Sequence, residues 1–211
     1  MLPSKLPKAV FLDKDGTLIE NVPYNVDPAR IVLKVGALEA LKQLHAAEFK
    51  IIIISNQSGV ALGRFKEQDL IAVEECLRQM LASAGIPLDS FYYCPHHPDG
   101  RLAQYSTGCF CRKPSPGLLF RAAREHQLNL AASWMIGDIL NDVEAGRRAD
   151  CRTVLIDNGS ETDWQISPLR RPHFTAANLL DAAGHILSLE KAAVRPTAAA
   201  GSITLDTSVS V

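Results

Sequence analysis

The sequence predicts an α/β fold in which helices cover both faces of a parallel sheet, a doubly wound arrangement. Short aliphatic runs alternate along the chain with segments whose apolar residues recur at helical spacing, which is typical of repeated βα units. The run 51–54 is purely aliphatic, as expected of a strand buried on both faces. With 211 residues, the chain is long enough for one domain with a full core.

Five strands are predicted, over residues 9–12, 51–54, 91–93, 134–137 and 153–156. Leucines at positions 38, 41 and 44 predict a helix that begins near Gly36. Apolar residues at positions 70, 73, 77 and 81 predict a second helix, which Gly85 and Pro87 close.

Three further helices are predicted in the second half of the chain. Ser115 followed by Pro116 is typical of an N-cap and a first helical position, so we expect a helix from there to about His126. Residues 142–149 and 176–193 predict the other two. We expect one domain over residues 1–190 and a disordered tail over residues 191–211, where Ala, Thr and Ser dominate the last positions.

The charge balance excludes several classes of partner. Lys and Arg number 22 against 23 Asp and Glu, so nothing in the overall charge indicates binding to nucleic acid or to an anionic membrane. Pro3, Ser4, Pro7 and Lys8 interrupt the N-terminal segment, which therefore lacks the apolar stretch of a secretory signal. We expect a cytoplasmic protein.

The five cysteines do not resemble a disulfide framework, because their number is odd in a chain of this size. Three of them form the patterns Cys94-x-His96 and Cys109-x-Cys111 within a polar segment that is too long for an ordinary βα loop. Three thiolates and one imidazole complete a closed, tetrahedral, structural zinc site. By spacing alone, His97 competes with His96 as the fourth ligand.

Polar residues follow four of the predicted strands in turn, within residues 13–17, 55–59, 112–114 and 138–142. The carboxyl ends of parallel strands meet at one edge of a sheet, where ligands bind. Three carboxylates brought together there require a hard cation such as Mg²⁺, and a lysine beside them suits a phosphate. One aspartate of an Asp-x-Asp pair can then attack phosphorus, while the other exchanges protons with the leaving oxygen.

These segments resemble, in order, the four motifs of the haloacid dehalogenase-like phosphatases. They are Asp-Lys-Asp-Gly-Thr at 13–17, Ser-Asn-Gln-Ser-Gly at 55–59, Lys113, and Gly-Asp-x-x-x-Asp at 137–142. Within that superfamily, residues 92–98 and 109–114 are similar to the heptose 1,7-bisphosphate 7-phosphatases, and the resemblance covers about residues 8–190. It implies a Rossmann-like fold with a zinc loop at 94–111 and without a large cap domain. It also implies Mg²⁺-dependent removal of the 7-phosphate of the sugar, in the heptose branch of lipopolysaccharide core synthesis.

The resemblance also assigns roles to individual residues. Asp13 is expected to be the nucleophile and Asp15 the general acid and base. Mg²⁺ would be held by the Asp13 carboxylate, the Asp15 main-chain carbonyl and Asp138. Ser55 and Lys113 would stabilise the transferring phosphoryl group.

Further residues are expected around this centre. Asn21, Tyr24, Asn56 and Arg112 would contact the substrate, and Asp142 would orient Lys113 or a metal-bound water. For the zinc site, the resemblance selects four ligands, which are Cys94, His96, Cys109 and Cys111.

Two positions depart from the family pattern. Leu62 and Ile139 stand where relatives often carry a basic residue near the substrate, which leaves less positive charge for a second phosphate. Lys14 or Arg64 could supply that charge instead.

Two alternatives to a heptose bisphosphatase are weighed. A histidinol-phosphate phosphatase shares the zinc loop and the Asp-x-Asp-Gly-Thr motif, but the longer loop and Ser-Asn-Gln-Ser-Gly favour the heptose enzymes. A non-catalytic, zinc-stabilised binding module is disfavoured by the intact Asp13, Asp15, Lys113 and Asp138. The expected partner is a small phosphorylated sugar, and the expected oligomeric state is a monomer.

Overall fold

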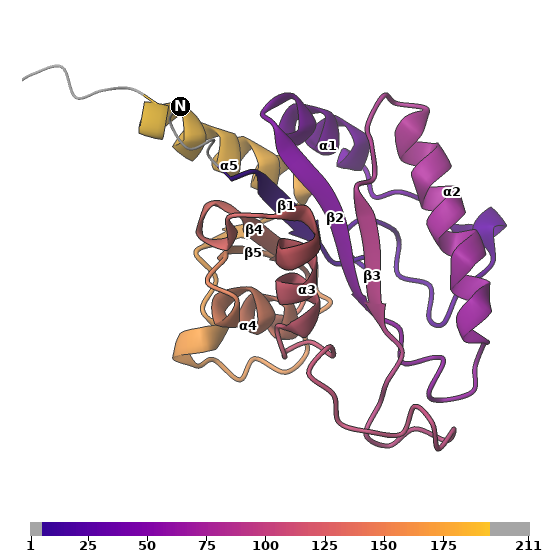
Figure 1. Cartoon of the computed structure of the whole chain (residues 1–211). Helices are drawn as coiled ribbons and strands as arrows, with labels where there is room; N and C mark the ends of the chain where they lie inside the picture. Colours follow the sequence, from indigo (N-terminus) through magenta and orange to yellow (C-terminus); the bar gives the residue numbers. More distant parts are fainter. Residues whose placement is uncertain (1–5, 195–211) are drawn as a thin grey trace, which may run out of the picture.

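In the part of the chain that the structure describes, a parallel sheet of six strands forms the centre (Figure 1). The computed structural model describes residues 6–194. The strands are β1 (Lys8–Leu12), β2 (Phe49–Asn56), β3 (Ser90–Cys94), β4 (Trp134–Gly137), β5 (Arg152–Ile156) and β6 (Phe174–Ala176). They lie in the order β3-β2-β1-β4-β5-β6, and every neighbouring pair is parallel. The predicted α/β class is confirmed.

Helices pack on both faces of this sheet, as predicted. They are α1 (Ala37–Ala46), α2 (Leu70–Ala82), α3 (Gly117–His126), α4 (Leu140–Arg148) and α5 (Leu179–Val194). Alternate strand residues face opposite sides: Val10 and Leu12 pack with α1, α2 and α5, while Ala9 and Phe11 pack with α3 and α4. Short 3₁₀ helices lie at Pro28–Arg30, Glu67–Asp69, Leu130–Ala132 and Pro168–Arg170.

The five predicted strands are present, and the structure adds a sixth. Strand β2 continues through Ser55 and Asn56, beyond the predicted end at Ile54, because these residues pair with β3. The short edge strand β6 was missed, and the helix predicted from Ala176 begins instead at Leu179. Ala176 pairs with Ile156, and the Asn178 side chain accepts a hydrogen bond from Asp181 N at 2.9 Å at the start of the helix.

Two predicted helix starts are also corrected. Helix α3 begins at Gly117, and the Ser115 side chain does not cap it. The Ser115 backbone N–H donates a hydrogen bond to Arg112 O at 2.8 Å instead. Helix α4 begins at Leu140, before the predicted Asp142, because the Glu161 carboxylate accepts a hydrogen bond from Leu140 N at 2.6 Å.

The strand order places a ligand site at the carboxyl end of β1. The chain winds outward from β1 in both directions, so the loops after β1 and β4 separate there and leave a crevice. Within residues 6–194, the segment between β3 and α3 holds no helix or strand, so no cap domain is inserted there. The described helices include none that is both long enough and apolar enough to cross a membrane. Residues 195–211 of the predicted tail lie outside the described residues, and α5 continues to Val194.

Candidate active site and metal clusters

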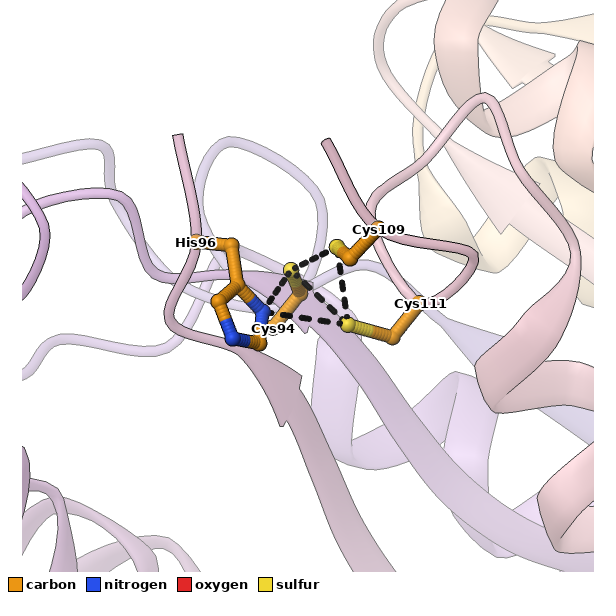
Figure 2. Close-up of side chains that lie close together, drawn as sticks. All are labelled: Cys94, His96, Cys109 and Cys111. Carbon is orange, nitrogen blue, oxygen red and sulfur yellow. Dashed lines mark hydrogen bonds between the residues drawn. The ribbon is translucent and has the colours of Figure 1, made fainter. Parts of the chain in front are cut away.

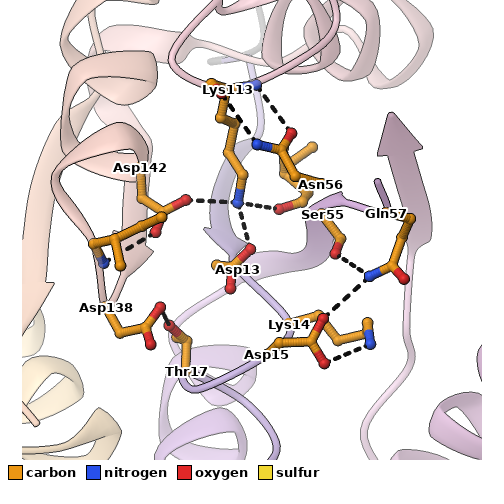
Figure 3. A network of polar contacts seen from close by, with 12 residues as sticks. Asp13, Lys14, Asp15, Thr17, Ser55, Asn56, Gln57, Lys113, Asp138 and Asp142 are labelled. Carbon is orange, nitrogen blue, oxygen red and sulfur yellow. Dashed lines mark hydrogen bonds and ion pairs between the residues drawn. The ribbon is translucent and has the colours of Figure 1, made fainter. Parts of the chain in front are cut away.

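Three carboxylates meet at this crevice (Figure 3). Asp13 follows β1, Asp138 follows β4, and Asp142 lies in the first turn of α4. One oxygen of each lies within 4.8 Å of the others. All three residues are buried, and the sheet brings Asp13 next to two aspartates that lie more than 120 positions later in the sequence.

Lys113 inserts its ammonium group among these carboxylates. Its Nζ forms ion pairs with Asp13 and, at 2.6 Å, with Asp142 Oδ1, and it donates a hydrogen bond to Ile54 O at 2.8 Å. The side chain is only 2% exposed, so its position is fixed by these contacts.

Asn56 fixes the main chain of Lys113. Its Oδ1 accepts from Lys113 N at 3.0 Å, and its Nδ2 donates to Lys113 O at 3.1 Å. This reciprocal pair joins the end of β2 to the segment before α3. A residue predicted to contact substrate therefore also positions the lysine.

Burial dominates the electrostatics of the carboxylates. It raises the pKa of Asp13 to about 7, against the lowering effect of Lys113, and it raises the pKa of Asp138 to about 6, with a further contribution from Asp13. Burial also raises the pKa of Asp142. Burial would lower the pKa of Lys113, but Asp13 and Asp142 together raise it above its usual value.

This donor set fits a divalent cation. One ammonium cannot balance the charge of three buried carboxylates, so the cluster has room for further positive charge. Oxygen ligands of this kind are preferred by hard cations such as Mg²⁺.

Asp15 faces a small cavity of about 240 Å³ next to this cluster. Its Oδ2 accepts a hydrogen bond from Gln57 Nε2 at 3.1 Å, and the same Nε2 donates to Ser55 Oγ at 2.7 Å. Gln57 thus links two predicted site residues, a role that the sequence reasoning missed although Gln57 lies inside a quoted motif.

The predicted substrate contacts separate into two groups. Asn21, Tyr24 and Asn56 line the cavity together with Asp15. Arg112 does not line it, because its Nη1 donates to the main-chain oxygen of His96 at 3.3 Å, toward the cysteine cluster.

The turn after Asp15 is packed tightly against Asp138. Gly16 has a φ of +86°, and a Cβ atom there would lie 1.9 Å from Asp138 Oδ2. Two contacts that the sequence reasoning missed hold this turn: Thr17 Oγ1 donates to Asp138 Oδ1 at 3.3 Å, and Asn158 Nδ2 donates to Gly16 O at 2.8 Å. Asn158 shortly follows β5, so the rule of polar residues beyond strand ends could have found it.

The three cysteines and the histidine of the long loop also meet, in a second cluster (Figure 2). Cys111 Sγ lies 3.0 Å from Cys109 Sγ, 3.2 Å from Cys94 Sγ and 3.4 Å from His96 Nδ1. His97 lies outside the cluster, since its Nδ1 accepts a hydrogen bond from Asp99 N.

The second cluster is suited to a soft metal ion. The hydrogen bond between Cys94 and Cys111 is the largest of several that lower the pKa of Cys111, to about 5, while that same bond raises the pKa of Cys94. The thiolate is the form that binds metal. The four ligand atoms of the cluster lie within 4.8 Å of one another, which fits an ion such as Zn²⁺.

Comparison with known proteins identifies the family. A family model described as HAD-hydrolase-like matches residues 110–182. A D-glycero-beta-D-manno-heptose-1,7-bisphosphate 7-phosphatase of Yersinia pestis is 36% identical over 170 residues, covering 76% of this chain and 90% of the relative. The chain belongs to this phosphatase family. The family resemblance predicted from the four motifs is therefore confirmed.

Other members of the family support the assignment. The enzyme of the same name from Photorhabdus laumondii is 39% identical over 175 residues, covering 82% of this chain and 88% of the relative. A solved structure of D,D-heptose 1,7-bisphosphate phosphatase from B. bronchiseptica, complexed with magnesium and phosphate, has a TM-score of 0.71 at 28% identity and covers 86% of this chain and 99% of its own. A HAD-like phosphatase structure from Mesorhizobium loti has a TM-score of 0.75 at 32% identity, and the match covers 89% of this chain and 88% of that structure.

Proposed function

We propose that the protein is a Mg²⁺-dependent phosphatase that removes the 7-phosphate of D-glycero-beta-D-manno-heptose 1,7-bisphosphate. The observation that carries this proposal is the meeting of Asp13, Asp138 and Lys113 at the crevice of the sheet. Its family relatives carry the name of this activity, and one relative was solved with magnesium and phosphate bound.

In the first step, an Asp13 oxygen forms a bond to phosphorus while the bond from phosphorus to the sugar oxygen breaks. The sugar oxygen keeps the electron pair and takes a proton from Asp15, which faces the cavity. Lys113 and the Ser55 hydroxyl stabilise the phosphoryl oxygens. Gln57 donates to Ser55 Oγ, so the Ser55 hydrogen remains available for phosphate.

In the second step, water attacks the phosphorus of the aspartyl phosphate and gives a proton to Asp15. The bond between Asp13 and phosphorus breaks, which releases inorganic phosphate and restores the Asp13 carboxylate and the protonated Asp15. Asp142 keeps the Lys113 ammonium in place throughout.

Mg²⁺ would be held by the Asp13 carboxylate, the Asp15 main-chain carbonyl and Asp138. When bound there, it would neutralise the phosphate oxygens and the surrounding carboxylates. Zn²⁺ would be held by Cys94, His96, Cys109 and Cys111, and its role would be structural.

We place this activity in one monomeric domain that covers residues 1–190 and acts in the cytoplasm on lipopolysaccharide core precursors. Cysteines that bind Zn²⁺ must stay reduced, which supports a reducing compartment. Asn21, Tyr24 and Asn56 would contact the sugar in the cavity. Arg112 would reach the substrate only by leaving its hydrogen bond to His96 O.

Release of inorganic phosphate tests the proposal. We expect turnover of heptose 1,7-bisphosphate that depends on Mg²⁺ and exceeds turnover of histidinol phosphate and of an aryl phosphate. Faster hydrolysis of histidinol phosphate would replace the proposed substrate, and no hydrolysis of any phosphate ester with Mg²⁺ present would overturn the proposed activity.

A further inference from the structure

Lys14 is a buried charged residue that the mechanism above does not use. It lies between Asp13 and Asp15, and only 1% of its surface is exposed. Its Nζ pairs with Asp15 Oδ1 at 2.7 Å (Figure 3). Among residues 6–194, the ammonium makes no other hydrogen bond or ion pair.

Asp15 is held from two sides by this lysine and by Gln57. Lys14 occupies Oδ1, and Gln57 Nε2 donates to Oδ2 at 3.1 Å. The Asp15 side chain is nevertheless 31% exposed, because it borders the cavity lined by Asn21 and Tyr24. The two donors therefore fix the carboxyl group while leaving it open toward the cavity.

Stability alone does not explain a buried lysine at this position. Withdrawing an ammonium from water is costly, and buried ion pairs can often be replaced by apolar residues without loss of stability. Lys14 also lines the cavity, so the buried ammonium lies beside the site where a leaving group would enter. This location indicates a functional reason for burying it.

We propose that Lys14 is a positioning residue for protonation of the leaving group: it holds Asp15 at the cavity so that its proton reaches the sugar oxygen. This inference rests on the proposed function. When the bond from phosphorus to the sugar oxygen breaks, that oxygen receives the electron pair and the Asp15 proton, and Lys14 pairs with the Asp15 carboxylate that remains. Lys14 is thereby engaged with Asp15 and is not the free cation for a second phosphate.

The test compares two leaving groups. A sugar phosphate departs as an alcohol and needs the proton, whereas 2,4-dinitrophenyl phosphate departs as a stable anion and does not. The value of kcat/KM reports the steps up to departure of this first product, so it separates leaving-group protonation from later hydrolysis of the aspartyl phosphate.

We expect Lys14→Met to lower kcat/KM for heptose 1,7-bisphosphate by about 10- to 100-fold, which is less than the roughly 10²- to 10⁴-fold that general acid catalysis contributes, because Asp15 itself remains. The loss for dinitrophenyl phosphate is expected to be less than about 3-fold, since that step needs no acid. Lys14→Arg should restore most of the sugar phosphate activity. The same substitution at an exposed lysine of α1, Lys42→Met, should change neither value.

An equal loss on both substrates would overturn the inference, because it would show that Lys14 only supports the loop of Asp13. No loss on either substrate would overturn it as well. If Lys14→Met does not fold, Gln57→Leu removes the second donor to Asp15. It must lower kcat/KM for the heptose bisphosphate by more than the loss shared by both substrates, which follows from its contact with Ser55. If the wild type does not hydrolyse the heptose bisphosphate, the proposed function fails, and a simple alkyl phosphate then replaces it in the comparison for Lys14.

Discussion

The two clusters of metal-ligating side chains differ in chemistry and in the way the fold holds them. Asp13, Asp138 and Asp142 come from the ends of two strands and the start of a helix, and the sheet fixes them. The cysteine and histidine ligands come from β3 and a single loop, at residues 94–111, which has no helix or strand of its own. A sheet positions the first cluster, whereas the loop of the second is held by turns and backbone hydrogen bonds, and we expect a bound metal ion to fix it further.

The two clusters are also connected. Cys111 lies two positions before Lys113, whose ammonium reaches into the carboxylate cluster. Arg112, between them, donates to His96 O. We therefore predict that substitutions in the carboxylate cluster lower activity without lowering stability. Substitutions in the cysteine cluster should destabilise the loop, and activity should fall as a consequence.

The largest effect is expected for Asp13→Asn. The amide cannot attack phosphorus, so turnover should fall on the order of 10⁴-fold. The fold and the zinc content should be unchanged, because the sheet and the loop ligands remain. Phosphate release, thermal melting and elemental analysis measure the three quantities.

Asp150→Asn is the matched control for that variant. Asp150 is exposed beyond α4 and has a φ of +61°, a conformation that Asn also adopts readily. It should retain full activity. Retained turnover in Asp13→Asn would remove Asp13 as the nucleophile, and a loss of zinc would show that the clusters are less separate than the comparison states.

A smaller loss of activity is expected for Cys109→Ser, together with a loss of stability. Removing one of four ligands should lower the zinc content below one ion per chain and lower the melting temperature. Cys111, two positions before Lys113, would then be held less firmly by the metal ion, so Lys113 could shift. A displacement of about 1 Å can lower the rate about 10²-fold.

Cys76→Ser separates this effect from the loss of any thiol. Cys76 lies outside the cluster, on α2, where its Sγ contacts Pro28 O. This variant should keep its zinc and its activity. A zinc-free Cys109→Ser protein with wild-type melting temperature and rate would contradict a structural role for the second cluster.

Much of both clusters could be predicted from the sequence because their motifs are local. Asp13 and Asp15 are two positions apart, and so are Cys94 and His96, and Cys109 and Cys111. The residue types and their spacing can therefore be read directly from the sequence. Spacing alone left His96 and His97 open, and the family resemblance selected His96. The structure agrees, because His96 Nδ1 lies beside the cysteines and His97 lies outside the cluster.

The contacts that the sequence could not predict are those between distant segments. Nothing local indicates that Asn158 holds Gly16, or that Asn56 exchanges two hydrogen bonds with Lys113. Strand β6 was missed for a related reason: three residues at a sheet edge carry too little periodicity to distinguish them from a loop.

The smallest predicted effect concerns the rim of the cavity, where the carboxylate cluster meets its substrate. Leu62 and Ile139 carry no charge, and Lys14 is engaged with Asp15. The exposed Arg64 guanidinium lies 5.5 Å from the ring centre of Tyr24, which lines the cavity, and no carboxylate of residues 6–194 forms an ion pair with it. Arg64 is therefore the cation we expect to contact the second phosphate of a bisphosphate.

Arg64→Gln should lower kcat/KM for heptose 1,7-bisphosphate about 3- to 10-fold, because an exposed charge contributes on the order of 1 kcal/mol. The value for the corresponding 7-monophosphate should stay within about 2-fold, because that substrate lacks the second phosphate, and the difference should shrink at high salt. Arg101→Gln, at an exposed site in the cysteine loop, provides the control and should affect neither substrate. An equal loss on both substrates would assign Arg64 to support of Tyr24 instead. Selectivity for the second phosphate would then have to come from Arg112, which could reach the substrate only by leaving its hydrogen bond to the cysteine loop.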